Sequence, residues 1–154
     1  MVALNIFFIS DKCFDGKVLK PRISKTIASH EDAVTKRICV SNSIKSCLNA
    51  TLDTVCSHSD TIFAHVCYSD EVVVPSDRQV HDARVTGERW LLKPALFELY
   101  DEFKVKLVHM PRKNRLQYNF YGKRTGEHII IYATNMFQWY GESYSKDLYQ
   151  RVIW

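Results

Sequence analysis

The sequence lacks the features that mark membrane, disulfide-stabilised and zinc-binding proteins. Its apolar start, residues 1–10, is too short to cross a bilayer and has no basic leading segment or cleavage site. We therefore expect residues 3–9 to form a first strand, and the protein to be cytoplasmic with no membrane partner. Five cysteines, an odd number with no C-x-x-C pair, argue against a secreted disulfide framework and against a zinc site. Cys39 lies in an apolar run and is expected to pack in the core.

The common catalytic motifs are also missing. The six histidines form no H-x-x-x-H pair, and the chain contains no G-x-G-x-x-G, G-K-[ST] or G-x-S-x-G. These absences disfavour metal-dependent hydrolysis, P-loop nucleotide chemistry and α/β-hydrolase chemistry. No metal site is expected.

What is present fits one globular domain, residues 1–154. The chain is 46% hydrophobic and 25% charged, which is ordinary for a folded domain and argues against disorder. Its net charge of +4 is mild. No repeat, linker or low-complexity segment divides it.

Positive charge is concentrated between residues 104 and 128, which we call the basic rim. Seven basic residues occur there against one acid, Glu127. Such a rim attracts phosphate, nucleic acid or an acidic protein, although a solvated hairpin is the simpler interpretation. Aromatic residues between 118 and 140 interleave with these basic residues, and they could stack bases or form core and cross-strand pairs. The predicted partner-binding residues, which would contact a partner protein or nucleic acid, are Arg112, Lys113, Arg115, Lys123 and Arg124.

Apolar periodicity predicts an α+β fold with a mostly antiparallel sheet and one main helix in the N-terminal half. The helix is expected from Ile44, with apolar residues at 44, 47, 48, 52 and 55, and with Ser41 or Ser43 as its cap. A tight turn is expected at Asp15-Gly16. Strands are expected at residues 3–9, 37–41, 61–68, 71–74 and 88–94, with at least one more in 97–110 and a hairpin over 116–121 and 128–134.

Three parts of this pattern suggest a ligand site. Ser41 and Ser43 lie where a strand meets a helix, a place suited to anions as well as to simple capping. Arg22 can hold phosphate through its planar fork, or form a surface salt bridge with Glu31 or Asp32. Glu88 begins an apolar strand, where a carboxylate could orient a hydroxyl or stabilise a developing cation, or be an ordinary edge residue.

Four short motifs occur in an order that resembles the ADP-ribosyltransferase-like fold, which has small members in phages and bacterial mobile elements. They are FFIS at 7–10, LKPRI at 19–23, RICVSNSI at 37–44 and TGERWLL at 86–92. The resemblance covers roughly residues 4 to 108. It implies a split antiparallel sheet with an NAD-type cleft that Ser10, Arg22, Ser41 and Ser43 line. Glu88 would then contact the nicotinamide ribose and stabilise the oxocarbenium-like state.

The sequence departs from the family pattern at Phe8, where the early strand of family members carries His or Arg. Either Arg22 takes over that role, or the pocket binds without reacting. If Arg22 does take over, the resemblance implies an NAD-dependent ADP-ribosyltransferase that modifies a host macromolecule. The alternative is a non-catalytic phage protein, in the cytoplasm of a bacterial host, that inhibits a host defence or other host component through its basic surface. A third possibility is an RNA-directed module that uses the basic, aromatic C-terminal half.

Overall fold

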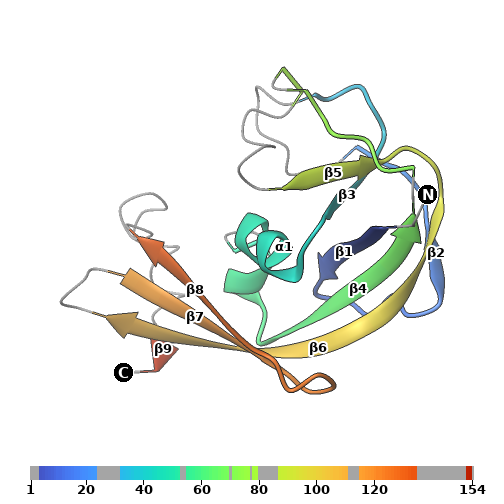
Figure 1. The fold of residues 1–154 in the computed structure, drawn as a ribbon. Helices are drawn as coiled ribbons and strands as arrows, with labels where there is room; N and C mark the ends of the chain where they lie inside the picture. The colour runs from blue at the N-terminus through green and yellow to red at the C-terminus, as the bar shows by residue number, and fades with distance from the viewer. Residues whose placement is uncertain are drawn as a thin grey trace.

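The structure, a computed structural model, describes residues 4–23, 32–52, 55–69, 71–76, 78–79, 87–110, 115–134 and 152–153. Within these ranges it is a strand-rich α+β fold with one α-helix (Figure 1). This confirms the expected fold class at the level of a mostly antiparallel sheet with one helix. The elements are β1 (Leu4–Ser10), β2 (Lys17–Leu19), β3 (Ile38–Ser41), α1 (Ile44–Ala50), a 3₁₀ turn (Cys56–His58), β4 (Thr61–Ser69), β5 (Glu88–Leu91), β6 (Ala95–Met110), β7 (Arg115–Gly122), β8 (His128–Thr134) and β9 (Val152–Ile153).

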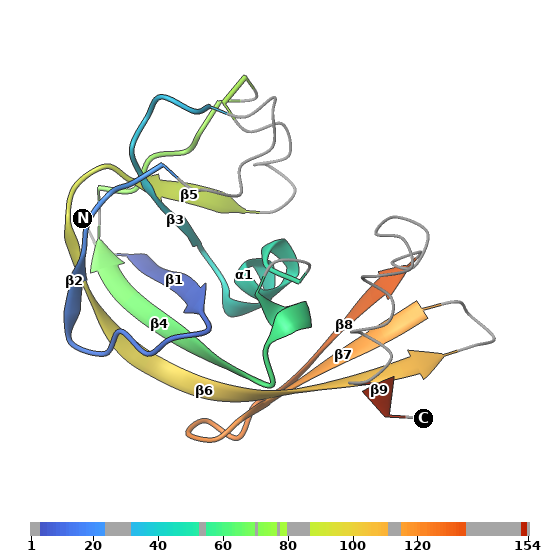
Figure 2. The ribbon, with the colours of Figure 1, turned by 180° about the vertical axis from the view of Figure 1, so that it is seen from behind.

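The strands form one connected sheet in the order β5-β3-β1-β4-β6-β7-β8, with β2 and β9 also paired with β6. The pairings are antiparallel except for β9, which runs parallel to β6. The 16-residue β6 accounts for the additional strand expected in 97–110. It is long enough to pair with N-terminal strands at its start and with the C-terminal hairpin of β7 and β8 at its end (Figures 1 and 2). It therefore connects the N-terminal strands to the C-terminal hairpin.

The N-terminal strands curl into a closed ring. β2 pairs with the start of β6, and the chain beyond β2 then returns to β3. The closing contact is an isolated bridge in which Arg22 and Arg37 exchange two backbone hydrogen bonds of 3.0 Å. The ring thus runs β3-β1-β4-β6-β2 and back to β3, as in a small barrel. One apolar cluster packs between the ring strands and the neighbouring β5: Ile6, Ile38, Val40, Cys67, Leu91 and Phe97.

The hairpin of β7 and β8 extends the sheet beyond the ring, and α1 lies in the angle between the two parts (Figures 1 and 2). Leu48 of α1 is fully buried in a second apolar cluster with Phe103, Leu107 and Phe120. The hairpin expected over 116–121 and 128–134 is confirmed. Among the described residues no helix combines the length and apolar character that crossing a bilayer requires.

β6 contains a bulge where it leaves the ring. Ala64 of β4 faces Asp101, but the next residue, His65, faces Leu99, so Tyr100 has no partner on β4. A bulge of this kind increases local twist and bends the strand. It lies where β6 passes from the ring to the hairpin.

The carboxylate of Asp101 fixes the turn between β7 and β8 to this bulge. Its side chain is fully buried. It accepts backbone hydrogen bonds from Glu102 (2.8 Å), Arg124 (2.8 Å) and Thr125 (3.1 Å), and another from the Thr125 hydroxyl. Burial alone would raise the pKa of Asp101, but hydrogen bonds from Thr125 and Arg124 hold it below its usual range. Gly122 leaves the space that this carboxylate occupies.

The helix α1 begins as expected but ends early. Ser43 is its N-cap, and the Ser43 hydroxyl accepts the Ser46 N–H at 3.1 Å. At the other end the Thr51 hydroxyl donates to the Cys47 carbonyl at 2.8 Å, and the Thr51 N–H bonds to the Leu48 carbonyl. Because these bonds satisfy carbonyls of the last turn, the helix stops before the apolar spacing does.

Two expectations are wrong. Residues 71–74 do not form a strand, since only Val73 pairs, in an isolated bridge with Trp90. Cys39 is exposed, not packed in the core. Side chains alternate along a strand, and the neighbours of Cys39, Ile38 and Val40, take the buried face of β3.

Candidate functional site

A hollow of about 500 Å³ opens beside the end of β1, the end of β2 and the start of β3. We call it the ring-end hollow. Only one position, Phe7 with Ser41, pairs β1 with β3 in the described register, so the two strands separate toward the hollow. Its volume lies within the range of small-molecule sites. The described residues that line it are Phe8, Ser10, Asp11, Lys12, Phe14, Val18, Leu19, Lys20, Arg22, Arg37, Ile38 and Cys39.

The lining of the ring-end hollow is strongly positive. Four basic residues contribute to it against one acid, Asp11. Within the described part of the chain, Lys12, Lys20 and Arg22 form no ion pair. Uncompensated cations around a concave surface raise the local concentration of anions. The hollow is therefore suited to a negatively charged ligand.

Arg37 adds a buried positive charge to the wall. It is only 2% exposed, and its Nη1 donates to the carbonyls of Asp32 (2.6 Å) and Thr35 (2.9 Å). Its guanidinium lies 4.5 Å from the centre of the Trp90 ring. Among the described residues, its buried Nε has no acceptor. Arg37 also acts on the Cys39 thiol, which lines the hollow beside it. Its positive charge therefore adds to the attraction of the hollow for an anion.

The Asp32 carboxylate forms no ion pair with Arg22 or Arg37. It accepts the backbone N–H groups of Val34 (2.7 Å) and Thr35 (2.8 Å) and the Thr35 hydroxyl (2.7 Å). These hydrogen bonds, those from Thr35 first, hold the pKa of Asp32 below its usual range. The salt bridge considered between Arg22 and Asp32 is not formed, and the other partner considered, Glu31, lies outside the described residues.

Aromatic rings form the apolar part of the hollow. The Phe8 ring centre lies 6.3 Å from that of Phe14 and 5.8 Å from that of Phe97. The fully buried His65 accepts the Phe14 N–H at Nε2 (2.9 Å), and its Nδ1 lies 3.3 Å from the Phe8 carbonyl. These contacts suit a neutral imidazole protonated at Nδ1, and burial lowers the pKa of His65. His65 thus anchors the turn that carries Lys12, and it is not placed for acid–base chemistry.

The structure divides the five predicted site residues into two groups. Ser10 and Arg22 line the ring-end hollow. The second group lies where β3 ends, α1 begins and β5 starts, and it consists of Ser41, Ser43 and Glu88. In the pairing of β3 with β5, Ser41 lies opposite Glu88. No member of this second group is among the described residues of the hollow. Along β3, about 13 Å separates Arg37 from Ser41, at roughly 3.3 Å per residue.

Gly87 brings Glu88 close to the start of α1. Its φ is +71°, and a Cβ at this position would lie 2.9 Å from Asn42 Oδ1 and 3.3 Å from Ser46 Oγ. A left-handed glycine thus allows the chain to pass close to the helix before β5 begins. Ser41 itself is buried, at 3% exposed.

Sequence patterns did not single out Lys12, Phe14, Lys20 and Arg37. The available signal was weak: lysines flank the tight turn at Asp15-Gly16, and a basic residue precedes β3. These four residues share a location because the Arg22–Arg37 bridge closes the ring, and no local sequence pattern predicts that bridge.

The basic rim is partly used inside the molecule. Lys123 forms a 3.0 Å ion pair with Glu102, and Arg124 Nη1 donates to the Leu99 carbonyl at 2.9 Å. Arg112 and Lys113 lie outside the described residues, as does the side chain of Arg115. Exposed lysines of the rim remain on β6, at positions 104 and 106.

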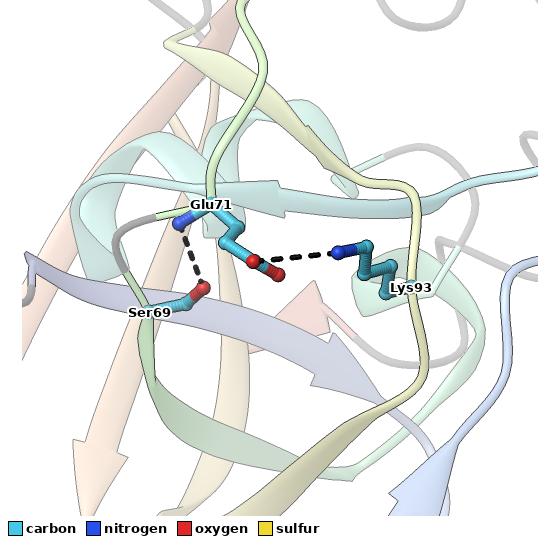
Figure 3. Close-up of polar contacts among 3 residues, drawn as sticks. All are labelled: Ser69, Glu71 and Lys93. Atoms are coloured by element: carbon cyan, nitrogen blue, oxygen red, sulfur yellow. Dashed lines mark hydrogen bonds and ion pairs between the residues drawn. The ribbon is translucent and has the colours of Figure 1, made fainter.

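Two smaller hollows, of about 290 and 330 Å³, share Ser69, Pro94 and Ala95. Beside the first, Glu71 forms a 3.4 Å ion pair with Lys93, and the Glu71 N–H donates to Ser69 Oγ at 3.1 Å (Figure 3). Because Glu71 and Lys93 neutralise each other, the first of these hollows carries little net charge. It is a weaker candidate than the ring-end hollow.

The described residues show no metal-binding cluster, and the buried Cys47 is unsuited to thiol chemistry. No group of three or more His, Cys, Asp or Glu side chains there is placed to hold a metal ion. The buried Cys47 thiol donates to the Phe7 carbonyl at 3.1 Å. Burial raises the pKa of Cys47 to about 12, so it stays a thiol at neutral pH and is a poor nucleophile.

No protein-family model, curated protein or solved structure matches this chain. Its function has to be argued from its own residues.

Proposed function

We propose that this chain binds a phosphate-bearing ligand of the nucleotide class in the ring-end hollow. The observation that carries the proposal is the concentration of Lys12, Lys20, Arg22 and Arg37 around one aromatic-walled hollow, against the single acid Asp11. Arginine forks and lysine ammonium groups bind phosphate oxygens through charge-assisted hydrogen bonds. The rings of the wall suit the flat, apolar part of such a ligand.

NAD is the first ligand to test. The resemblance to the ADP-ribosyltransferase-like fold points to it, and we propose that fold as the finer assignment of this antiparallel sheet. Phe8 lines the hollow where the family pattern has a His or Arg, and Arg22 lies in the same lining. This arrangement supports the substitution of Arg22 for the family residue in holding phosphate.

Transfer of ADP-ribose would require Glu88 to reach the nicotinamide ribose. Glu88 is grouped with Ser41 and not with Ser10 and Arg22. Glu88 nevertheless lies beside Cys39, which lines the hollow: desolvation first, and then the Glu88 carboxylate, raise the pKa of Cys39 to about 12. Glu88 is therefore at the border of the hollow, and transfer remains to be distinguished from the non-catalytic alternative of a protein that acts on a host component. Binding and transfer are therefore tested separately.

The test of binding is calorimetric titration of the full chain with NAD, ADP-ribose and AMP. Arg22 is exposed and contributes only backbone bonds to the ring closure, so Arg22→Ala should fold normally. Loss of a charge-assisted contact, about 1.5–3 kcal/mol, weakens binding roughly 10- to 100-fold. Lys45→Ala, which removes an exposed cation on α1, is the matched control and should bind as the unmodified chain does. If none of the three ligands binds at millimolar concentration, the proposal fails.

The test of transfer is nicotinamide release from NAD. Release that Glu88→Gln abolishes, with ADP-ribose affinity unchanged, would establish Glu88 as catalytic. Binding without release would identify a binding protein, and the search would move to the host component.

A further inference from the structure

The outward side of the β6–β7–β8 sheet carries lysines and rings side by side. Register places Lys104, Tyr121 and His128 next to one another across the three strands. Partners in register share a face, and residues two apart along a strand do so too. The opposite face is the buried core of Phe103, Leu107 and Phe120. We call the outward side the hairpin face; its members include Lys104, Lys106, Gln117, Asn119, Tyr121 and His128.

Two rings on the hairpin face are already stacked. Tyr121 and His128 lie with ring centres 4.4 Å apart and planes 14° from parallel. Tyr121 is 40% exposed and His128 is also exposed. The Lys106 ammonium lies 5.5 Å from the centre of the Tyr121 ring. Rings and a cation are thus available to a ligand at one place.

A buried amide holds this pair in position. Asn119 is only 4% exposed, and its Oδ1 accepts from Gln117 Nε2 and from His128 Nε2, both at 3.0 Å. An amide oxygen can only accept, so His128 carries its proton on Nε2. Because the imidazole is fixed before any ligand arrives, binding costs little side-chain entropy.

Few acidic side chains lie near the two lysines. Between residues 102 and 134 the described acids are Glu102 and Glu127, and Asp60, which precedes β4, lies beside β6, where its carbonyl accepts the Val105 N–H at 2.8 Å. Glu102 forms the ion pair with Lys123, and Glu127 accepts the Tyr100 hydroxyl at 2.7 Å. Lys104 and Lys106 are exposed, and neither forms an ion pair within the described residues. The charge of the hairpin face is therefore complementary to a polyanion.

We propose that the hairpin face binds single-stranded nucleic acid, separately from the ligand of the ring-end hollow. A base stacks on the Tyr121–His128 pair, and Lys106 moves from the ring toward a phosphate, with Lys104 at the next one. Single strands suit such a face because their bases are not covered by neighbours in a duplex. An open sheet face carrying aromatic side chains is a known geometry for this contact.

The test is fluorescence anisotropy of the full chain with labelled single-stranded RNA, single-stranded DNA and duplex of mixed sequence, over a salt series. Single strands should bind more tightly than duplex. The logarithm of the binding constant should fall with the logarithm of salt by about 0.7 for each phosphate neutralised. The RNA and DNA arms show whether the 2′-hydroxyl contributes.

Two variants and two controls locate the binding. Tyr121→Ala should weaken binding roughly tenfold through lost stacking. The double variant Lys104→Ala/Lys106→Ala should reduce the salt slope by about 1.4. Lys17→Ala/Lys45→Ala removes the same charge from exposed positions elsewhere and should leave the slope within about 0.7 of the unmodified chain. Arg22→Ala should have no effect on strand binding.

Several results would overturn the inference: no binding of any strand, equal binding of duplex, or equal losses in the test and control lysine pairs. Strand binding that Arg22→Ala abolishes would assign it to the ring-end hollow instead. Thermal unfolding followed by circular dichroism checks that each variant is folded. If Tyr121→Ala is not folded, the slope of the lysine variant decides the outcome alone.

Discussion

Replacing Asp101 by Asn exchanges one carboxylate oxygen for an NH₂ group in a side chain that holds the bulge of β6 to the β7–β8 turn. In the structure one carboxylate oxygen accepts the N–H groups of Glu102 and Arg124, both at 2.8 Å. The other accepts the Thr125 N–H at 3.1 Å and the Thr125 hydroxyl. Asparagine keeps one oxygen, and its NH₂ group must face backbone donors that point at the same place. Two acceptor bonds are lost, whichever way the amide is turned.

The size of the effect follows from those bonds. A hydrogen bond to a charged group contributes about 1.5–3 kcal/mol net, so two contribute about 3–6 kcal/mol. The Thr125 hydroxyl can rotate, which recovers part of one bond. We expect Asp101→Asn to lower the free energy of unfolding by about 3–5 kcal/mol, or to lower Tm by roughly 10 °C for a chain of this length.

Urea unfolding followed by circular dichroism at pH 7 measures this change. Glu98→Gln, an exposed carboxylate on the same strand, is the control and should stay within about 0.5 kcal/mol of the unmodified chain. The folded-state pKa of Asp101 is lowered, so its contribution is present above the ordinary value of about 3.9 and is lost as pH falls through the folded value. The stability of Asp101→Asn should therefore depend less on pH in the acid range. A loss under about 1 kcal/mol, or an unchanged acid dependence, would refute this account of the carboxylate.

Three further changes test local features. Gly122→Ala places a Cβ against the Asp101 carboxylate and should cost over about 2 kcal/mol in urea unfolding, against about 1 kcal/mol for Gly126→Ala, whose Cβ meets nothing. Ser43→Ala removes the cap of α1 and should cost about 1 kcal/mol, with equal stability as the contrary result. His65, whose folded pKa is lowered, should make stability fall as pH drops below about 6.5, because the unfolded chain binds the proton first. A flat unfolding free energy between pH 8 and 5.5 would count against this.

Features set by neighbouring residues were predictable. Short apolar or alternating runs predicted β1, β3, β4, β5 and the hairpin correctly. A strand that buries a face needs apolar residues at regular spacing over a few neighbouring positions, and this pattern is visible in the sequence. Gly16, at φ +71°, makes the tight turn expected at Asp15-Gly16. Ser43 caps α1 because a serine just before an apolar helix accepts its unpaired N–H groups.

The candidate site was predictable only in part. Ser10 and Arg22 do share a hollow, but Ser41, Ser43 and Glu88 are grouped elsewhere. The sequence order of the motifs does not reveal which of them meet, because that depends on how strongly the strands curl. The pairing of Val73 alone, where a strand was expected over 71–74, shows the same limit: apolar content does not ensure a partner strand.

The sequence by itself determined the strand-rich α+β character, the single capped helix and the hairpin, because periodicity and capping act over a few residues. Only the tertiary structure decided three things: closure of the ring by Arg22 and Arg37, the bulge that buries Asp101, and the hollow that gathers the cations around Phe8. Each depends on contacts between residues far apart in the chain. Such contacts form when loop-closure entropy is offset by burial of the whole core, and no local pattern records that balance.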